Sequence, residues 1–332
     1  METLIDFVLL SFLVLTALAV AKMHDLFAVV MLSGIYSLLS ASLFFDLDAV
    51  DVAFTEASVG AGISTLLMLA SLKLVGRYER RTRYRPMLAL GVVLATGTLL
   101  IYGTLDMPHF GSAEAPVHQH VAPRYLHDSM DEVGVPNVVT SVLASYRGYD
   151  TLGETLVVFT AGIGVISLLR VSRRTKKEEK KRVPADMQQQ IILRVVVKWL
   201  LPLILIFALY VQFHGDYGPG GGFQAGVIFA AGIILYTMLF GLSNASRAYK
   251  PELLELLSAF GVLLYAGVGL VCMALGGNFL DYNHLRHDPV HGQHLGILLV
   301  ELGVGITVAS VMITIFFKFT WRTVKQKYIK SR

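Results

Sequence analysis

Nine long apolar runs constrain this chain more than any other feature of its sequence. Each run approaches the roughly 20 residues that a helix needs to cross a bilayer, and most carry no charge in the middle. The runs cover about 3–21, 25–45, 51–74, 86–104, 151–170, 191–213, 222–243, 252–273 and 295–317. Only 16% of the 332 residues are charged, whereas soluble domains have about 25% charged residues. We therefore predict an all-α, polytopic membrane protein with about nine transmembrane helices.

The basic residues predict an orientation for these helices. When nine spans alternate, 25 of the 28 lysines and arginines fall on one side of the membrane, and only Arg124, Arg147 and Arg286 fall on the other. The positive-inside rule makes the basic side cytoplasmic. We expect the N-terminus outside and the C-terminus in the cytoplasm, in a bacterial or archaeal plasma membrane. The positive charge then faces lipid headgroups, and no nucleic-acid partner is predicted.

The runs and the charged stretches between them divide the chain into three predicted modules. Residues 1–85 hold three helices, residues 86–182 hold two helices, and residues 183–332 hold four. A long outer segment separates the two helices of the second module. Its first part is expected to be loop, whereas apolar residues at helical spacing over 137–149 predict a short amphipathic helix at the outer membrane interface.

The stretch HGDYGPGGGFQAG, residues 214–226, contains six glycines between two of the apolar runs. It matches a dinucleotide-binding pattern, but that pattern has meaning only between a strand and a helix, and no Lys-Ser or Lys-Thr follows as a P-loop requires. We predict instead a structural turn whose glycines allow close helix packing. The turn residues are Pro219, Gly220, Gly221, Gly222 and Phe223. The alternative is that its free backbone groups line a polar cavity.

Carboxylates inside the apolar runs are functional hypotheses, because an ionisable group in a membrane is costly. Glu56 lies beside Thr55 and other hydroxyl residues, which suits a hard cation such as Na+ or a relayed proton. The alternative for Glu56 is an ion pair that only fixes assembly. Glu301 has no local group to satisfy it, so it must face a polar partner.

Three further ionisable residues have two readings each. Glu154 follows Thr151 by three residues, which is either a helix capping box or part of an ion relay. Lys198 either extends its amine to the cytoplasmic surface or relays protons. His214 either passes protons at the outer mouth or only caps the glycine turn.

Nine of the ten histidines are predicted outside. Four of them have the spacing H-x2-H-x3-H-x2-H: His284, His287, His291 and His294. Zinc needs three or four ligands that converge tetrahedrally, and Pro289 and Gly292 break a common helical face. We therefore predict no metal site, with zinc at these four histidines as the alternative to solvated loop residues. Cys272 is the only cysteine, and no cofactor is predicted.

Three motifs in this order resemble a known family. His214-Gly215 with Pro219–Gly226 resembles the HG…PGGGFxGG signature of the B-type subunit of multisubunit Na+/H+ antiporters of the Mrp/Mnh type, with Ala225 as a departure. DVAFTEASVGAGIST, residues 51–65, resembles the C-terminal end of the large A-type subunit of these antiporters. The same segment forms a separate small subunit in membrane-bound hydrogenases. Residues 137–169, with YRGYDTLGE at their centre, resemble the next element of those proteins.

The resemblance implies a fusion of the C-terminal part of the A-type subunit with the B-type subunit. Such a chain is not an enzyme but a non-autonomous subunit of a monovalent cation/proton antiporter, with Na+ and H+ as its ions. Its expected partners are the large proton-translocating subunits, small membrane subunits and the lipid bilayer. The expected ion-relay residues are Glu56, Glu154, Thr55, Lys198, Glu301 and His214. The alternative is a membrane-arm subunit of a hydrogenase-type or related respiratory complex, although the chain lacks the cysteine motifs that bind clusters.

Overall fold

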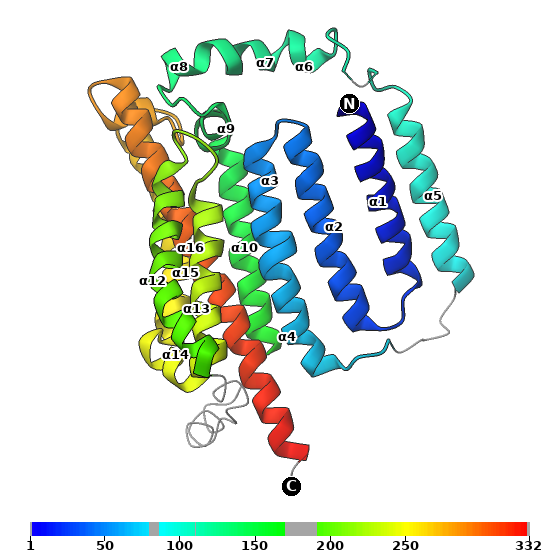
Figure 1. Cartoon of the computed structure of the whole chain (residues 1–332). Coiled ribbons are helices and arrows are strands. Elements are labelled where there is room, and N and C mark those ends of the chain that lie inside the picture. Colours follow the sequence, from blue (N-terminus) through cyan, green and yellow to red (C-terminus); the bar gives the residue numbers. More distant parts are fainter. Residues whose placement is uncertain (1, 80–85, 110, 170–190, 331–332) are drawn as a thin grey trace.

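The computed structural model describes residues 2–79, 86–109, 111–169 and 191–330, which form helices joined by turns (Figure 1). Among these residues, nine helices or joined helical runs are long and apolar enough to cross a membrane. They are Leu4–Lys22, Leu26–Asp46, Val50–Val75, Pro86–Thr104, Gly148–Leu168, Ile191–His214, Gly222–Phe240, Pro251–Ala274 and Pro289–Thr323. Each corresponds to one predicted apolar run, so the all-helical class and the number of spans are confirmed. The two ends of the chain lie at opposite ends of the helices (Figure 1).

The first three spans stand side by side in a row (Figure 1). They are α1 (Glu2–Lys22), α2 (Leu26–Asp46) and a third span built from α3 (Val50–Glu56), the π-helical segment η1 (Ala57–Ser64) and α4 (Thr65–Val75). The π-helical segment begins directly after Glu56, and π-helical turns are rare and often mark functional sites. The next span, α5 (Pro86–Thr104), has no buried residue. Because α5 is apolar all round, it requires lipid or other protein around it.

The remaining spans form a bundle around the last helix. They are α10 (Gly148–Leu168), α12 (Ile191–His214), α13 (Gly222–Phe240), α15 (Pro251–Ala274) and α16 (Pro289–Lys330), with the short α14 (Leu242–Ala248) between α13 and α15. Helix α16 packs against α10, α13, α15 and α4. Its buried residues Ile297, Val304, Val308 and Phe317 belong to the main hydrophobic core.

Glycines let the helices of this bundle approach α16 closely. A methyl group at Gly226 of α13 would lie 2.7 Å from the carbonyl oxygen of Gly305 in α16. A methyl group at Gly303 of α16 would lie 2.7 Å from the carbonyl oxygen of Gly261 in α15. Backbone contacts of this kind are typical of membrane helices, which associate through packing rather than through the hydrophobic effect.

The segment between α5 and α10 differs from its prediction. Residues 116–132, expected to be loop, are almost continuously helical and cross one end of the molecule as α6 (Pro116–Gln119), α7 (Val121–Pro123), η2 (Arg124–Asp128) and α8 (Ser129–Glu132) (Figure 1). The amphipathic helix expected over 137–149 exists as α9 (Val138–Thr140) and η3 (Ser141–Tyr146). Its predicted place at the membrane interface is wrong, because Thr140, Ser141 and Ala144 are buried against protein.

Candidate functional site

The glycine-rich stretch forms a tight loop over residues 215–221, between α12 and α13. The amide of Gly221 donates to the carbonyl of Val211 at 3.0 Å, which folds the loop back onto the end of α12. Gly221 has φ +113°, a value that favours glycine. A methyl group at Gly220 would lie 2.8 Å from the Val211 oxygen, so the loop has no room for a side chain there. We call residues 215–221 the glycine loop.

Two residues from earlier spans hold the glycine loop in place. The side-chain amide of Asn137 donates to the carbonyls of Gly215 and Gly218, each at 3.1 Å. Asp51, in the first turn of α3, accepts from the amide of Gly220 at 3.2 Å and from Asn137 at 3.4 Å. Neither contact is among the predictions from the sequence. The only local signal was the position of Asn137 at a helix start, where its side chain accepts from the amide of Val139.

Glu301 of α16 faces the glycine loop from the side of the core. A methyl group would lie 3.1 Å from its Oε1 if added at Gly221 and 3.3 Å if added at Gly215. Protein encloses the carboxyl group on most sides, and none of the described residues donates a hydrogen bond to it. The charged groups close enough to act on it are Asp216 and Asp51, both acidic. The expected polar partner of Glu301 is therefore the glycine loop, and no cation of the described chain neutralises it.

Two glutamines complete this polar region, and both are buried. Gln224, in the first turn of α13, donates to the hydroxyl of Thr55 at 2.8 Å, while its Oε1 lies 3.6 Å from a methyl position at Gly221. Gln212 of α12 places its amide against Gly305 of α16. The Nε2 of Gln212 is buried and has no hydrogen-bond partner. We call Thr55, Gln212, Gln224, Glu301 and the adjoining glycine loop the loop site.

Glu56 lies outside the loop site. It is partly buried where α3 meets η1, and its Oε1 occupies the space in which a side chain at Gly60 would lie, next to the hydroxyl of Ser37 in α2. Thr55 and Asp51 lie on the opposite side of this span, toward α13 and the glycine loop. The π-helical segment thus separates a Glu56 face toward α2 from a Thr55 face toward the loop site.

Glu154 is exposed on α10, and the capping box expected for it is wrong. Helix α10 already begins at Gly148, and the hydroxyl of Thr151 donates to the carbonyl of Leu143 at 2.7 Å instead of capping. The preceding segment η3 leads almost directly into α10, so Thr151 is not at a free helix start. Tyr265 of α15, fully buried, lies within electrostatic range of both Glu154 and Glu301 and donates to the carbonyl of Gly148 at 2.7 Å.

Lys198 and His214 also lie apart from the carboxyl group of Glu301. They are at opposite ends of α12, roughly 24 Å apart along the helix axis. The amine of Lys198 is 5.9 Å from the ring centre of Phe240, over its face. His214 stacks on Tyr210 at 4.8 Å and lies beside Gly218.

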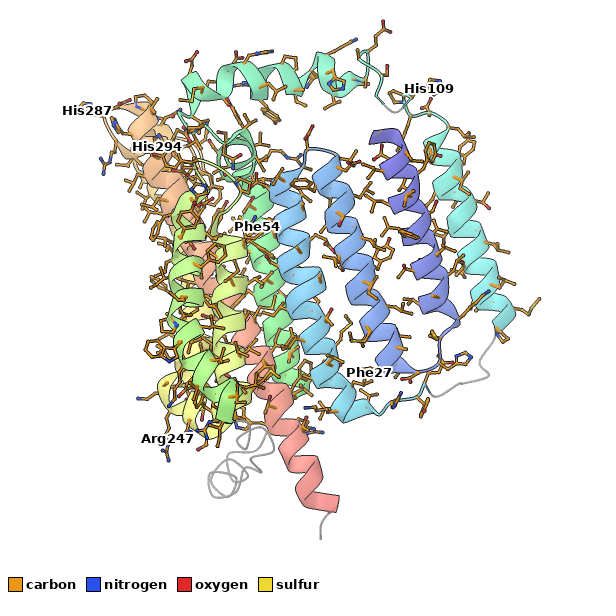
Figure 2. The ribbon with its side chains drawn as sticks, in the orientation of Figure 1. Phe27, Phe54, His109, Arg247, His287 and His294 are labelled. Atoms are coloured by element: carbon orange, nitrogen blue, oxygen red, sulfur yellow. The ribbon has the colours of Figure 1, made fainter. Side chains whose placement is uncertain are left out.

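The four histidines considered for zinc do not converge. His284 lies 3.3 Å from Asp281, His291 lies 2.5 Å from Asp288, and His294 lies 3.6 Å from Asp216. Figure 2 shows His287 and His294 at the outer end of the α15–α16 hairpin, and His109 far from them near α5. Within the described part of the chain, no three histidine, cysteine or acidic side chains are placed to hold a metal ion.

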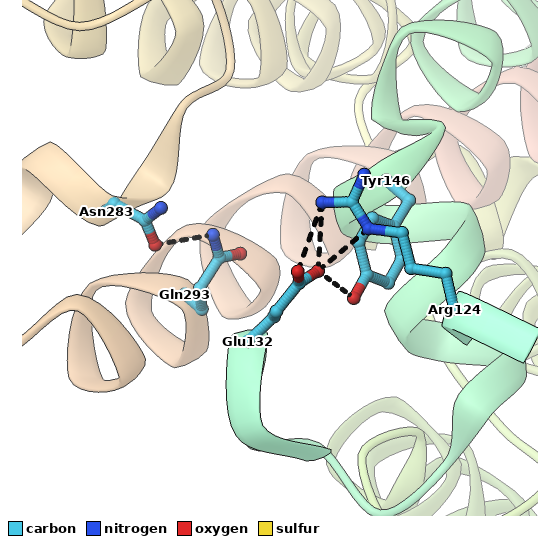
Figure 3. Close-up of polar contacts among 5 residues, drawn as sticks. All are labelled: Arg124, Glu132, Tyr146, Asn283 and Gln293. Atoms are coloured by element: carbon cyan, nitrogen blue, oxygen red, sulfur yellow. Dashed lines mark hydrogen bonds and ion pairs between the residues drawn. The ribbon is translucent and has the colours of Figure 1, made fainter. Parts of the chain in front are cut away.

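A separate polar cluster fastens the helical segment 116–132 to the bundle (Figure 3). Glu132 accepts from the hydroxyl of Tyr146 at 2.5 Å and pairs with Arg124 at 3.1 Å. These two contacts, the tyrosine hydrogen bond first, lower the pKa of Glu132. Close by, the amide of Gln293 donates to Asn283 at 2.9 Å, so α16 is held at the same end.

Comparisons with protein families cover nearly the whole chain. Residues 192–314 match the model described as a domain related to the MnhB subunit of Na+/H+ antiporters. Residues 11–77 match the MbhD family and residues 83–189 match the MbhE family, which are two subunits of MBH. The three matches follow one another in the order that the sequence motifs indicated.

Individual relatives give the same picture. A probable K(+)/H(+) antiporter A/B subunit of Rhizobium meliloti is 26% identical over 92% of this chain, which spans about a third of that relative (33%). A putative antiporter subunit mnhB2 of Staphylococcus haemolyticus is 32% identical over 131 residues, which are 39% of this chain and 92% of the relative.

Solved structures agree in fold. A chain of the Mrp complex from Dietzia sp. DQ12-45-1b superposes with a TM-score of 0.73 and 27% identity, over 94% of this chain and 34% of that one. A chain of the membrane-bound sulfane sulfur reductase, an archaeal respiratory complex, gives a TM-score of 0.51 and 28% identity, over 69% of this chain and 97% of that one. The chain therefore belongs to the MnhB family of Na+/H+ antiporter subunits, and its MnhB region follows regions of the MbhD and MbhE families.

Proposed function

We propose that this chain is a non-autonomous subunit of a multisubunit monovalent cation/proton antiporter and contributes to the path of Na+ and protons. The observation that carries the proposal is the meeting of three segments at the glycine loop. Asp51 comes from the MbhD-like region, Asn137 from the MbhE-like region, and the loop with Glu301 from the MnhB-like region. These segments enclose acidic and amide side chains within membrane-spanning helices, where such groups are costly unless they serve a function.

The basic end of the molecule, which holds Lys22, Lys198 and the C-terminus, faces the cytoplasm in this proposal. The glycine loop then lies near the outer surface. Modules 1–85, 86–182 and 183–332 form one path between them, with Glu56 and Glu154 as ion-relay carboxylates on two different faces of the bundle. Glu154 is exposed, so its ion partner comes from a neighbouring subunit. The apolar and fully unburied α5 supplies further surface for such subunits or for lipid.

A second candidate is a membrane-arm subunit of a redox-driven respiratory complex. One observation favours it: the matched chain of the sulfane sulfur reductase is covered over 97% of its length. The two functions differ in the energy source and in the neighbouring subunits, whereas the ion path through this chain is the same.

The test is ion exchange in membrane vesicles that contain the chain together with the subunits encoded beside it. We expect proton movement that depends on added Na+ or K+, and its loss in Glu56→Gln with the complex still assembled. Glu114→Gln, in the segment outside the spans, is the matched control and keeps full exchange. Full exchange with Glu56→Gln removes Glu56 from the path. If wild-type vesicles respond to neither cation but pump protons on addition of a reductant, the redox function is correct.

A further inference from the structure

We propose that the carboxyl group of Glu301 is a competitive exchange site, which holds either a proton or a partly dehydrated monovalent metal cation between the glycine loop and Gln224. This inference rests on the proposed function for its physiological meaning. The binding itself is argued from the contacts of the loop site and is tested without transport.

The charge around Glu301 is the first argument. The acidic groups that act on it are Asp51 of α3 and Asp216 of the glycine loop, and the titratable group facing it from α15 is the neutral Tyr265. Asp216 has His294 of α16 at 3.6 Å, and Asp51 accepts hydrogen bonds from Gly220 and Asn137. No described donor or cation contacts the Glu301 carboxyl itself. An enclosed carboxyl group in that position requires a bound proton or a bound cation.

The orientation of Gln224 is the second argument. The hydroxyl of Thr55 donates to the carbonyl of Asp51 at 2.9 Å, so it can only accept from Gln224. The amide nitrogen of Gln224 must therefore face Thr55, at 2.8 Å, and its oxygen faces Gly221 and Glu301. Two acceptor oxygens, Gln224 Oε1 and Glu301 Oε1, thus flank Gly221 with no donor between them. A proton on Glu301 or a cation bound by both oxygens satisfies this arrangement.

Gln212 is an independent indication of a ligand. It is only 7% exposed, and its Nε2 has no hydrogen-bond partner. It lies about one turn before Gly215 on α12 and contacts Gly305, one turn after Glu301 on α16. A buried amide without an acceptor is destabilising, so a water molecule of the ligand's hydration shell is its natural partner. Gln212 therefore extends the polar space from Glu301 toward the membrane interior.

The glycines keep side chains out of this space. Substituents at Gly215 and Gly221 would come within 3.3 Å and 3.1 Å of Glu301 Oε1. Oxygen ligands without competing side chains suit a hard cation such as Na+ or K+. Because a cation binds only the deprotonated carboxylate, its binding releases the proton and becomes weaker at low pH.

The test is labelling of the assembled complex with dicyclohexylcarbodiimide, which adds to protonated carboxyl groups in apolar surroundings. Labelling at Glu301 is measured by peptide mass at several pH values, with NaCl or KCl replacing choline chloride at constant ionic strength. We expect labelling at neutral pH in choline and protection by Na+, K+ or both. The concentration for half protection should rise about tenfold for each unit decrease in pH, as competition for one proton requires. Glu301→Gln identifies the labelled peptide.

Gln224→Leu removes the amide oxygen while leaving Glu301 in place. It should keep the labelling in choline and need several-fold more cation for protection, whereas Gln119→Leu, outside the spans, should behave as wild type. The inference is overturned if Glu301 stays unlabelled in choline at neutral pH, or if neither cation protects it. Either result in a complex that still exchanges cations for protons would leave the proposed function standing, because labelling does not depend on transport.

Discussion

Two glycines of α15, six residues apart, should respond in opposite ways to the same substitution. A methyl group at Gly261 would lie 2.9 Å from the backbone nitrogen of Thr307 and closer still to the Thr307 hydroxyl and the Gly303 carbonyl of α16. A methyl group at Gly267 would meet no atom within 4 Å, because Gly267 lines an open apolar groove with Leu263 and Val271.

The contacts set the size of each effect. Overpacking typically costs about 1–3 kcal/mol, and Gly261→Ala should reach about 3 kcal/mol because two of its three nearest atoms belong to helix backbone that cannot rotate away. Gly267→Ala has no clash and should stabilise by about 0.5–1 kcal/mol, since alanine restricts the unfolded chain more than glycine does. We therefore expect Gly261→Ala and Gly267→Ala to shift stability in opposite directions.

The assay is the fraction of monodisperse complex that remains after heating in mild detergent, followed by size-exclusion chromatography. The midpoint temperature should fall for Gly261→Ala and stay level or rise for Gly267→Ala. Equal midpoints for the two variants would refute the close approach of α15 and α16 at Gly261 and Gly303. A loss of stability only in Gly267→Ala would show that another subunit fills the groove.

Two more predictions concern the end of the molecule that carries the glycine loop. Asn137→Asp keeps the cap on α9 but loses the donors to Gly215 and Gly218, at about 1–3 kcal/mol; faster hydrogen exchange over residues 214–221 should follow, and unchanged exchange would contradict the anchoring role. The pKa of Glu132 is lowered by Tyr146 and then Arg124, so its stabilisation is present above the ordinary carboxyl pKa and is lost as pH falls through the lowered pKa. Hydrogen exchange over residues 116–132 should therefore speed up on acidification, and Tyr146→Phe should reduce the difference; an equal response in the variant would argue against this cluster as the cause.

The contacts of the loop site could not be predicted from the chain alone. Gln224 and Thr55 are 169 residues apart, and Asn137 and Gly215 are 78 residues apart. Helical periodicity tells which side of one helix a residue occupies, but not which helix lies opposite. The cost of a charge in a membrane made Glu301 a candidate, and that argument needs no partner. The identity of its neighbours required the packing of α12, α13 and α16.

Local motifs failed where a neighbouring element changed their context. Thr151 and Glu154 have capping-box spacing, yet η3 leads almost directly into α10, so Thr151 is not at a free helix start. Residues 116–132 contain prolines and polar side chains, yet they are helical, and Arg124 and Tyr146 hold Glu132 at the end of that segment. In both cases the deciding contacts come from outside the motif.

The sequence by itself determined the nine spans and their apolar character, because the hydrocarbon thickness of a bilayer converts composition and length directly into helices. It also determined which residues are costly in such spans, and so which deserve a functional explanation. Only the tertiary structure decided that Glu301 faces the glycine loop, that Glu56 faces α2, and that Glu154 is exposed. The physical reason is that solvation acts on each residue separately, whereas helix packing depends on pairs of surfaces that lie far apart along the chain.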